Sequence, residues 1–298
     1  MELPRVTFAM MAYNDEKFVG ETVDSVLAQD YPALDIVISD DCSEDSTWSI
    51  IQARVAAYTG PHRVEIVRQP RNLYMGHYKA LWPLVRNDFC VFTSGDDVSP
   101  PHRTRTLVEH HLSTGALVVS SNARLIDEVG RELGTHHPLD IPVDLSLEAF
   151  SRTGYNPACF GAGISWHRSI FDYFGPLHPT VRNADELIPF RGMVLGTIAY
   201  LADPLVDWRQ HAGTMTLSKK LERATSDVER VLIEERRLNN KVANRYAMLV
   251  DLKTHVDRAG RSDRLNSVRL NLLNQLMQHV EQWLLLRAEM AHSGIGIR

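Results

Sequence analysis

The stretch that decides the fold is Phe89-Cys90-Val91-Phe92-Thr93-Ser94-Gly95-Asp96-Asp97-Val98-Ser99-Pro100-Pro101. A short apolar run bounded by turn residues is consistent with a buried strand of a parallel sheet. Such sheets bind ligands just beyond the carboxyl ends of their strands. Two adjacent carboxylates there repel each other unless a cation or hydrogen-bond donors compensate. The doublet therefore indicates either a divalent-metal site beside a phosphate-bearing ligand or a solvated turn before a helix.

The composition is that of an ordinary globular protein. The chain has 298 residues, 44% of them hydrophobic and 23% charged, which is enough for one large domain or a domain with an extension. No apolar run reaches the roughly 18 residues of a membrane span, and the N-terminus does not resemble a signal peptide. Cys42, Cys90 and Cys159 lack metal-binding or redox spacing. These features predict a cytoplasmic protein.

Charge is unevenly distributed along the chain. From Lys219 onward, 15 Lys and Arg stand against 10 Asp and Glu, a balance of +5 that leaves −10 for residues 1–218. An acidic body argues against nucleic acid as a partner. The basic tail leaves open a contact with another acidic surface or with anionic lipid headgroups.

Strand-like and helix-like segments alternate through the first part of the chain. Strands alternating with helices of about ten residues predict βαβ units and a mostly parallel α/β sheet. Residues 122–156 are polar and give no clear prediction. Strands are expected at 6–11, 36–38, 64–67, 89–92, 117–120 and 198–202, and helices at about 18–27, 48–58, 76–85 and 102–112.

The pattern changes from Leu221 onward. Apolar residues at helical spacing on either side of Gly260 predict an antiparallel helical hairpin. The second helix is apolar over much of its surface and contains Leu284-Leu285-Leu286. We expect this surface to be buried on the body, on a second subunit or at a membrane interface.

Polar and aromatic residues follow three of the predicted parallel strands in turn. Tyr13 follows the first, Asp41 the second, and Asp96-Asp97 the fourth. An aromatic ring at this edge can stack on a nucleobase, a carboxylate can accept a ribose hydroxyl, and another can hold a cation on phosphates. Singly, Tyr13 fits a packing residue and Asp41 a helix cap, but their joint placement favours a nucleotide site.

At this point the residues resemble a known family. Residues 6–14, 23–32 and 36–47 look like the opening of a family 2 glycosyltransferase with the GT-A fold, a Rossmann-like sheet flanked by helices. Ser94-Gly95-Asp96-Asp97 with Pro100-Pro101 resembles that family's DxD-type metal site. The similarity is close over residues 5 to about 110 and weaker to about 216.

The resemblance implies roles for the residues at the strand ends. Tyr13 and Asp41 match the positions that sandwich and hydrogen-bond the base, with Met11 contributing backbone. Asp96 matches the carboxylate near the ribose and metal, and Asp97 matches the ligand of Mg²⁺ or Mn²⁺ on the diphosphate. Such a hard cation prefers oxygen ligands and neutralises charge on the departing nucleoside diphosphate.

The family's catalytic carboxylate stands near the start of a later helix. The segment Asn183-Ala184-Asp185-Glu186-Leu187-Ile188-Pro189-Phe190-Arg191 fits this pattern, which implies Asp185 as the general base. Ala184 replaces the usual acid, so Glu186 stays an alternative. A carboxylate favoured by the helix dipole is the plain structural explanation.

Two cationic residues receive roles with an alternative each. Trp208-Arg209-Gln210-His211, followed by 213–216, resembles the family's C-terminal Arg-x-His segment, which implies His211 as a metal ligand or diphosphate contact. Lys79 stands where relatives carry an Arg and can serve the diphosphate. Packing for His211 and solvation for Lys79 are the alternatives.

The resemblance implies an inverting, metal-dependent glycosyltransferase that uses a nucleotide sugar, expected to be a UDP-sugar. Its acceptor hydroxyl would belong to a glycan, a lipid-linked molecule or a small molecule, in the synthesis of surface polysaccharide, glycolipid or glycoconjugate. We expect a domain at 1–218, with a nucleotide half to about 115 and an acceptor half from 116. The helical extension 219–298 would contact a second subunit or, peripherally, the inner face of the membrane through 221–290. An inactive scaffold and a nucleotidyltransferase are the alternatives.

Overall fold

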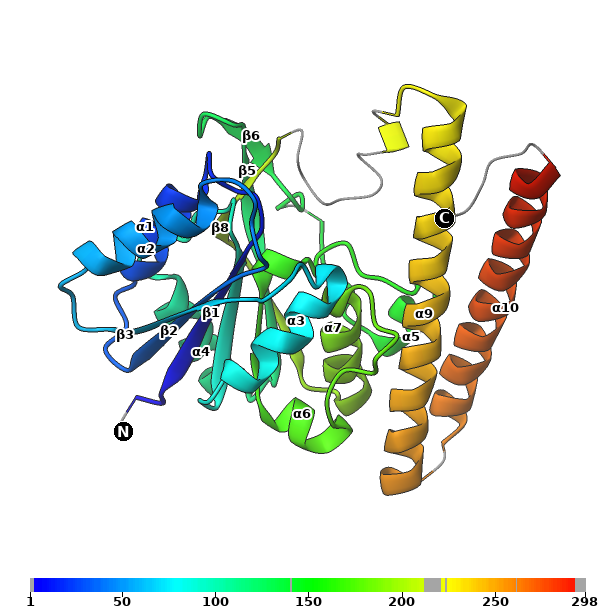
Figure 1. Cartoon of the computed structure of the whole chain (residues 1–298). Helices are drawn as coiled ribbons and strands as arrows, with labels where there is room; N and C mark the ends of the chain where they lie inside the picture. Colours follow the sequence, from blue (N-terminus) through cyan, green and yellow to red (C-terminus); the bar gives the residue numbers. More distant parts are fainter. Residues whose placement is uncertain (1–2, 140, 212–220, 223, 261, 293–298) are drawn as a thin grey trace.

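The computed structural model describes residues 3–139, 141–211, 221–222, 224–260 and 262–292. Over these residues, one eight-stranded sheet has the order β3-β2-β1-β4-β7-β5-β6, and β8 pairs with β5 (Figure 1). The strands are β1 (Val6–Ala12), β2 (Leu34–Asp40), β3 (Arg63–Arg68), β4 (Phe89–Ser94), β5 (Val118–Ile126), β6 (Glu132–Thr135), β7 (Ile164–His167) and β8 (Ile198–Arg209).

The parallel half of the sheet is the part that the sequence predicted. β1 pairs in parallel with both β2 and β4, so Met11 lies opposite Ser39 on one side and Ser94 on the other. β7 is antiparallel to both β4 and β5, while β8 is parallel to β5. The expected mostly parallel α/β sheet is confirmed, and the insertion of the short β7 was not predicted.

Helices cover both faces because alternate residues of each strand point to opposite sides. Val6, Phe8 and Met10 of β1 pack with α1 (Val19–Leu27), α2 (Thr47–Ala57) and α4 (Arg103–Thr114). Ala9 belongs to the larger cluster on the opposite face. That cluster includes residues of α3 (His77–Leu81), α5 (Leu147–Thr153), α6 (Ser169–Phe174) and α7 (Ala184–Leu195).

The chain ends in the predicted helical hairpin, formed by α9 (Asp227–Ala259) and α10 (Asp263–His292). Gly260 joins them at φ +87°, a conformation that glycine adopts without strain. Met248 of α9 and Leu272 of α10 are fully buried in the cluster that also holds α5 and α7. Figure 1 shows α9 between the body and α10, so the hairpin packs on the body through α9 and one end of α10.

The apolar surface of α10 is only partly covered. Leu265, Val268 and Leu272 are buried, whereas Leu270, Met277, Leu284 and Leu285 are each more than half exposed. The expected contact of residues 221–290 with a second subunit or a membrane stays a prediction. Within the described residues, no helix combines the length and apolarity needed to cross a membrane.

Three segments differ from the sequence prediction. The expected helix at 76–85 is broken into 3₁₀ turns (Tyr74–Gly76 and Trp82–Leu84) on either side of α3, the second containing Pro83, which lacks the N–H that a helix needs. The strand expected at 198–202 continues to Arg209. The polar segment 122–156 supplies the end of β5 together with β6 and α5.

Candidate active site

The carboxyl ends of β1, β2 and β4 are held together by short contacts between their loops. The backbone amide of Asp41 donates to the Ala12 carbonyl (2.9 Å), and the Thr22 hydroxyl donates to the Gly95 carbonyl (2.9 Å). A Cβ at Gly95 would collide with the Asp15 carboxylate and with Ala12, so only glycine fits there. The prediction that these strand ends meet at one edge is confirmed.

Tyr13 stands at this edge with its ring accessible. It follows β1 directly, is 37% exposed, and donates its backbone amide to Asp15 (3.0 Å). Asn14 then takes a left-handed conformation (φ +54°), which asparagine tolerates better than most residues. Met11, two residues earlier on β1, is partly buried against the core. Tyr13 is therefore accessible at this edge, and its stacking on a base stays a prediction.

Asp41 holds the loop that follows β3. Its two carboxylate oxygens accept the backbone amides of Leu73 (2.9 Å) and Tyr74 (3.0 Å). Burial raises the pKa of Asp41, against the opposing effect of these two amides. Tyr74, in a left-handed conformation, is 69% exposed and adds a second accessible ring near this carboxylate. Asp41 itself is only 3% exposed, so its predicted contact with a base stays a prediction.

Asp96 and His211 meet across the edge of the sheet. Nε2 of His211 lies 2.9 Å from Oδ2 of Asp96, and the imidazole ring packs against Phe18 (centroids 4.7 Å apart). Asp15 is a third polar group here, and its pKa is raised to about 7, chiefly by burial and next by the charge of Asp96. The sequence prediction did not include Asp15, although its place in the break after β1 could have suggested it.

Asp97 faces the protein interior instead. It is 1% exposed and accepts the backbone amide of Arg209 (3.0 Å), while Val98 and Asp207 exchange two backbone hydrogen bonds (3.1 and 2.8 Å). Burial and then the charge of Asp96 raise the pKa of Asp97 well above its ordinary value. The doublet follows β4 in a turn closed by the Asp97 amide and the Ser94 carbonyl, and in this turn only one member of the doublet contacts His211. That member is Asp96, whereas the sequence analysis assigned the metal to Asp97 and His211.

Arg209 is a buried cation at this edge. Its guanidinium donates to the carboxylate of Glu21 (2.6 Å) and to the carbonyls of Asp96 (3.0 Å) and Asp127 (3.2 Å). The residue is 1% exposed. Arg209 belongs to the Trp208-Arg209-Gln210-His211 motif, from which a role was predicted only for His211. Its spacing of two from His211 near the end of a strand is the signal that could have placed both on one face.

Asp185 lies in the first turn of α7. It is partly exposed, and its pKa is raised to about 7, chiefly by burial and next by the charge of Glu186. Tyr78 lies within its electrostatic reach and packs on Phe92 of β4 (centroids 5.2 Å apart). A Cβ at Gly161 would come within 3.9 Å of Asp185 Cβ. The glycine therefore lies directly beside the predicted base.

Glu186 is engaged by the hairpin. Its carboxylate accepts hydrogen bonds from Nδ2 of Asn244 (3.0 Å) and from the guanidinium of Arg245 (3.2 Å), both on α9. Asp185 and Glu186 were the two carboxylates that the sequence suggested as the base, and Glu186 has two hydrogen-bond partners on the hairpin.

Lys79 points toward the segment that leads into α7. Its ammonium group donates to the carbonyl of Pro179. Burial, and next the charge of Arg182, lower the pKa of Lys79. Its predicted contact with a diphosphate stays a prediction. Residues 213–216, which the sequence analysis compared with the loop after the Arg-x-His segment, lie outside the described residues.

Comparison with known proteins gives this arrangement a family. The model of glycosyl transferase family 2 matches residues 7–175, more than half of the chain. The chain belongs to this family. An uncharacterized glycosyltransferase of Nostoc sp. (strain PCC 7120) is 25% identical over 269 residues, covering 85% of this chain and 79% of the relative. The succinoglycan biosynthesis protein ExoO of Rhizobium meliloti is 32% identical over 133 residues, covering 44% and 37%.

Solved structures agree with the fold of this glycosyltransferase. TarS 1–349 of S. aureus, in complex with UDP-GlcNAc, has a TM-score of 0.58 at 14% identity and covers 93% of this chain and 81% of that one. The mannosyltransferase PcManGT of Pyrobaculum calidifontis, in complex with GDP-Man and Mn²⁺, has a TM-score of 0.55 at 14% identity, covering 95% and 88%. The expected GT-A fold is therefore confirmed.

The site of the glycosyltransferase offers an incomplete set of metal ligands. Across the part of the chain that the structure describes, no three His, Cys, Asp or Glu side chains gather to hold a metal ion. Asp96 and His211 provide one carboxylate and one imidazole, and the carboxylate is a ligand type that suits Mg²⁺ or Mn²⁺. These two side chains supply only part of the coordination that such an ion needs, and its binding stays a prediction.

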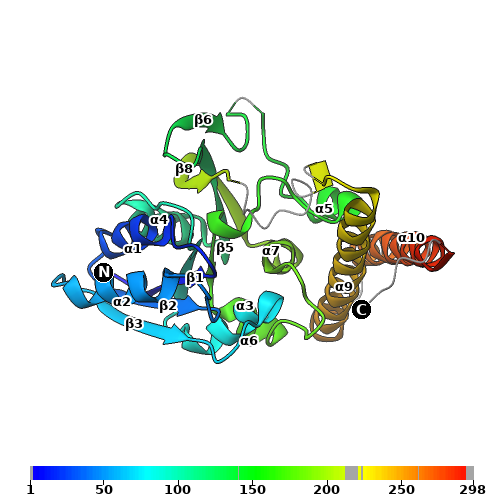
Figure 2. The same ribbon diagram turned by 45° about the horizontal axis from the view of Figure 1, so that its top comes forward.

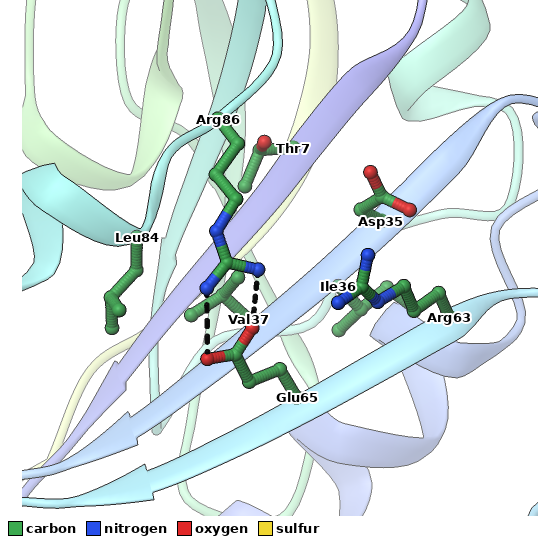
Figure 3. A pocket seen from close by; sticks show the side chains of 8 residues that line it. All are labelled: Thr7, Asp35, Ile36, Val37, Arg63, Glu65, Leu84 and Arg86. Carbon is green, nitrogen blue, oxygen red and sulfur yellow. Dashed lines mark hydrogen bonds and ion pairs between the residues drawn. The ribbon is translucent and has the colours of Figure 1, made fainter.

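A small pocket lies at the opposite edge of the sheet. Its lining includes Thr7, Asp35 and Arg63 near the starts of β1, β2 and β3, and Arg86 there pairs with Glu65 (2.7 Å; Figure 3). The amino ends of these strands point away from Asp96 and Asp41. This pocket is not part of the active site.

Proposed function

We propose that this family 2 glycosyltransferase is an inverting enzyme that moves a sugar from a nucleotide sugar, preferably a UDP-sugar, to an acceptor hydroxyl. The proposal is supported by the sheet edge that carries Tyr13, Asp41 and Asp96, where a nucleotide would bind, together with the raised pKa of the Asp185 carboxyl. The donor would bind the half up to about residue 115, and the acceptor the half 116–218.

Asp185 is the proposed general base. A base works best when its pKa lies near the working pH, and burial brings that of Asp185 to about 7. It would take the proton from the acceptor hydroxyl as the oxygen attacks the anomeric carbon. Glu186 is the weaker candidate, because Asn244 and Arg245 already hold its carboxylate.

The nucleotide would lie against Tyr13 and Asp41. Stacking on the Tyr13 ring and a hydrogen bond to Asp41 would fix the base, with Met11 supplying backbone. Lys79 donates to the Pro179 carbonyl in the segment that leads into α7. We propose Lys79 as a contact for the diphosphate.

Asp96 and His211 would hold Mg²⁺ or Mn²⁺, which would neutralise charge on the departing diphosphate. The contact between these two side chains favours Asp96 over Asp97 as the carboxylate ligand. Asp97 would instead fix the doublet by accepting the Arg209 amide.

The proposed product is a surface polysaccharide, glycolipid or other glycoconjugate. The similarity to ExoO, which is named for succinoglycan biosynthesis, supports the polysaccharide class. The acceptor would then be a glycan or a lipid-linked molecule, and the basic hairpin is consistent with work at the inner face of a membrane.

A thermal-shift panel tests the donor side. UDP, GDP, UDP-GlcNAc and GDP-Man are added with and without Mn²⁺, since ligands of the native state raise its apparent stability. We expect a metal-dependent shift with UDP that Asp96→Asn removes. Release of UDP as the sugar passes to water or to an added glycan hydroxyl, absent in Asp185→Asn, then shows turnover. A protein that binds none of the four nucleotides contradicts the proposal, and one that binds without turnover fits the inactive scaffold.

A further inference from the structure

Two ion pairs of opposite polarity join α7 to α9. Glu186 of α7 pairs with Arg245 of α9 (3.2 Å), and Arg191 of α7 pairs with Asp251 of α9 (2.7 Å). Both arginines are at most 2% exposed at the side chain. Figure 2 shows α7 between β5 and α9, so the helix that carries Asp185 in its first turn is held from its outer side by the hairpin.

The start of α7 depends on α9 for its polar partners. Asn183 occupies the N-cap position without a side-chain capping bond. Oδ1 of Asn244 instead accepts the backbone amide of Arg182 (2.9 Å), and Nδ2 of the same amide donates to Glu186 (3.0 Å). Asn244 is 1% exposed, so its position is fixed by packing. One side chain of the hairpin therefore fixes residues on both sides of Asp185.

Arg245 is itself braced by the body and by α10. Its Nε donates to Gln275 of α10 (2.7 Å), while Gln275 in turn donates to the Ser151 carbonyl of α5. Its guanidinium passes directly over Gly154, where any Cβ would collide with it. The charge that faces Glu186 thus has a defined place.

We propose that Asn244 and Arg245 are positioning residues that hold Glu186 on the hairpin side and leave Asp185 alone at the acceptor side. This inference rests on the proposed function of Asp185 as the base. Lys241 of α9 also lies within electrostatic reach of Glu186. Loss of the Arg245 charge therefore leaves the negative charge of Glu186 less compensated where it acts on Asp185. The other titratable groups within reach of Asp185 are Tyr78 of α3 and Cys159, which stay neutral at ordinary pH because burial raises both pKa values.

Arg245→Met tests the proposal through kinetics rather than folding alone. We expect kcat for UDP release to fall by about tenfold to a hundredfold, as misplacement of a catalytic group does, with the donor KM unchanged. The acid limb of the rate profile moves to higher pH, because a less compensated Glu186 disfavours ionisation of Asp185. UDP with Mn²⁺ shifts the melting temperature as in wild type, since Asp96 and His211 are untouched.

Rescue separates charge control from simple damage. Adding Glu186→Gln to Arg245→Met removes the unpaired carboxylate, and we expect the acid limb and most of kcat to return. Arg264→Met is the control, because it breaks another ion pair between the hairpin and the body. In that pair Arg264 of α10 contacts Glu148 of α5, which lies far from α7 in the sequence. We expect Arg264→Met to leave kcat and the pH profile unchanged.

Asn244→Asp tests the same proposal if Arg245→Met does not fold. An aspartate keeps the acceptor for the Arg182 amide but places a like charge beside Glu186, so the acid limb again moves to higher pH. A wild-type profile in both variants, or a double variant as impaired as Arg245→Met, overturns the inference. If Asp185→Asn retains turnover, the proposed base is wrong instead, whatever the α9 variants do.

Discussion

The guanidinium of Arg191 on α7 donates two hydrogen bonds to the carboxylate of Asp251 on α9, from Nε (2.7 Å) and from Nη2 (3.0 Å). The cation also donates to the Gly175 carbonyl (2.8 Å) and lies over the Phe174 ring (5.1 Å). Such two-fold contacts are the strong form of the arginine–carboxylate pair. The helix that carries Asp185 is therefore fastened to the C-terminal hairpin at a fully desolvated point.

Asp251→Ala should destabilise the protein by about 3–5 kcal/mol, because Arg191 would stay buried without its counter-charge. Asp24→Ala removes a salt bridge of similar length, Arg54–Asp24 (2.6 Å), whose partners are half exposed, and should cost at most about 1 kcal/mol. Urea unfolding of both variants measures the difference. Equal losses would show that the hairpin contact is not buried in solution.

The rate should depend on the ionisation of Asp185. Since a base must be ionised to accept a proton, kcat/KM should fall about tenfold per pH unit below pH 7, the approximate pKa of Asp185. Initial rates of UDP release between pH 5 and 9 test this. A flat profile over that range would exclude a carboxylate of raised pKa as the base.

The same raised pKa has a consequence for stability. A native-state pKa above the unfolded value favours the protonated carboxyl, so Asp185 contributes stability at low pH that is lost as the pH rises through about 7. Asp185→Asn should therefore be inactive yet more stable than wild type at pH 8, by roughly 1 kcal/mol, with the gain shrinking toward pH 5. Thermal unfolding at the two pH values measures it, and a gain that does not depend on pH would contradict the explanation.

Asp96 and Asp97 should behave differently on substitution. Asp97→Ala leaves the buried Arg209 amide without an acceptor and should cost about 1–3 kcal/mol. Asp96→Ala, at a partly exposed carboxylate, should leave the melting temperature within a few degrees of wild type but abolish the Mn²⁺-dependent shift with UDP. If Asp97→Ala folds normally and loses the metal effect while Asp96→Ala keeps it, the assignment made from the sequence is the right one.

Gly154→Ala should act on the active site from a distance. Gly154 has φ +75°, and a methyl group there would displace the Arg245 guanidinium. We expect lower stability, by about 1 kcal/mol or more, together with a reduced kcat. Gly115→Ala is the matched control, because Gly115 ends α4 in the same left-handed conformation (φ +69°) but has open space around its Cα. Only Gly154→Ala should change kcat.

Much of the active site was predictable because βαβ repetition leaves few arrangements open. Once residues 6–11, 36–38 and 89–92 are parallel neighbours, Tyr13, Asp41 and Asp96 must emerge at one edge. The reversed strand β7 was not predictable, because four residues carry too little periodicity to reveal direction. The hairpin helices were predictable from their spacing, but not the faces that they bury.

The sequence by itself determined the class of sheet, the edge that carries the polar residues, the family and the helical hairpin, since each depends on local periodicity or on a motif of neighbouring residues. Only the tertiary structure decided which of two adjacent carboxylates faces outward at Asp96-Asp97 and which turns to the hairpin at Asp185-Glu186. The physical reason is the same in both places. A partner distant in the chain, Arg209 for Asp97 and Arg245 for Glu186, binds one carboxylate, and the other is the one that we propose for chemistry.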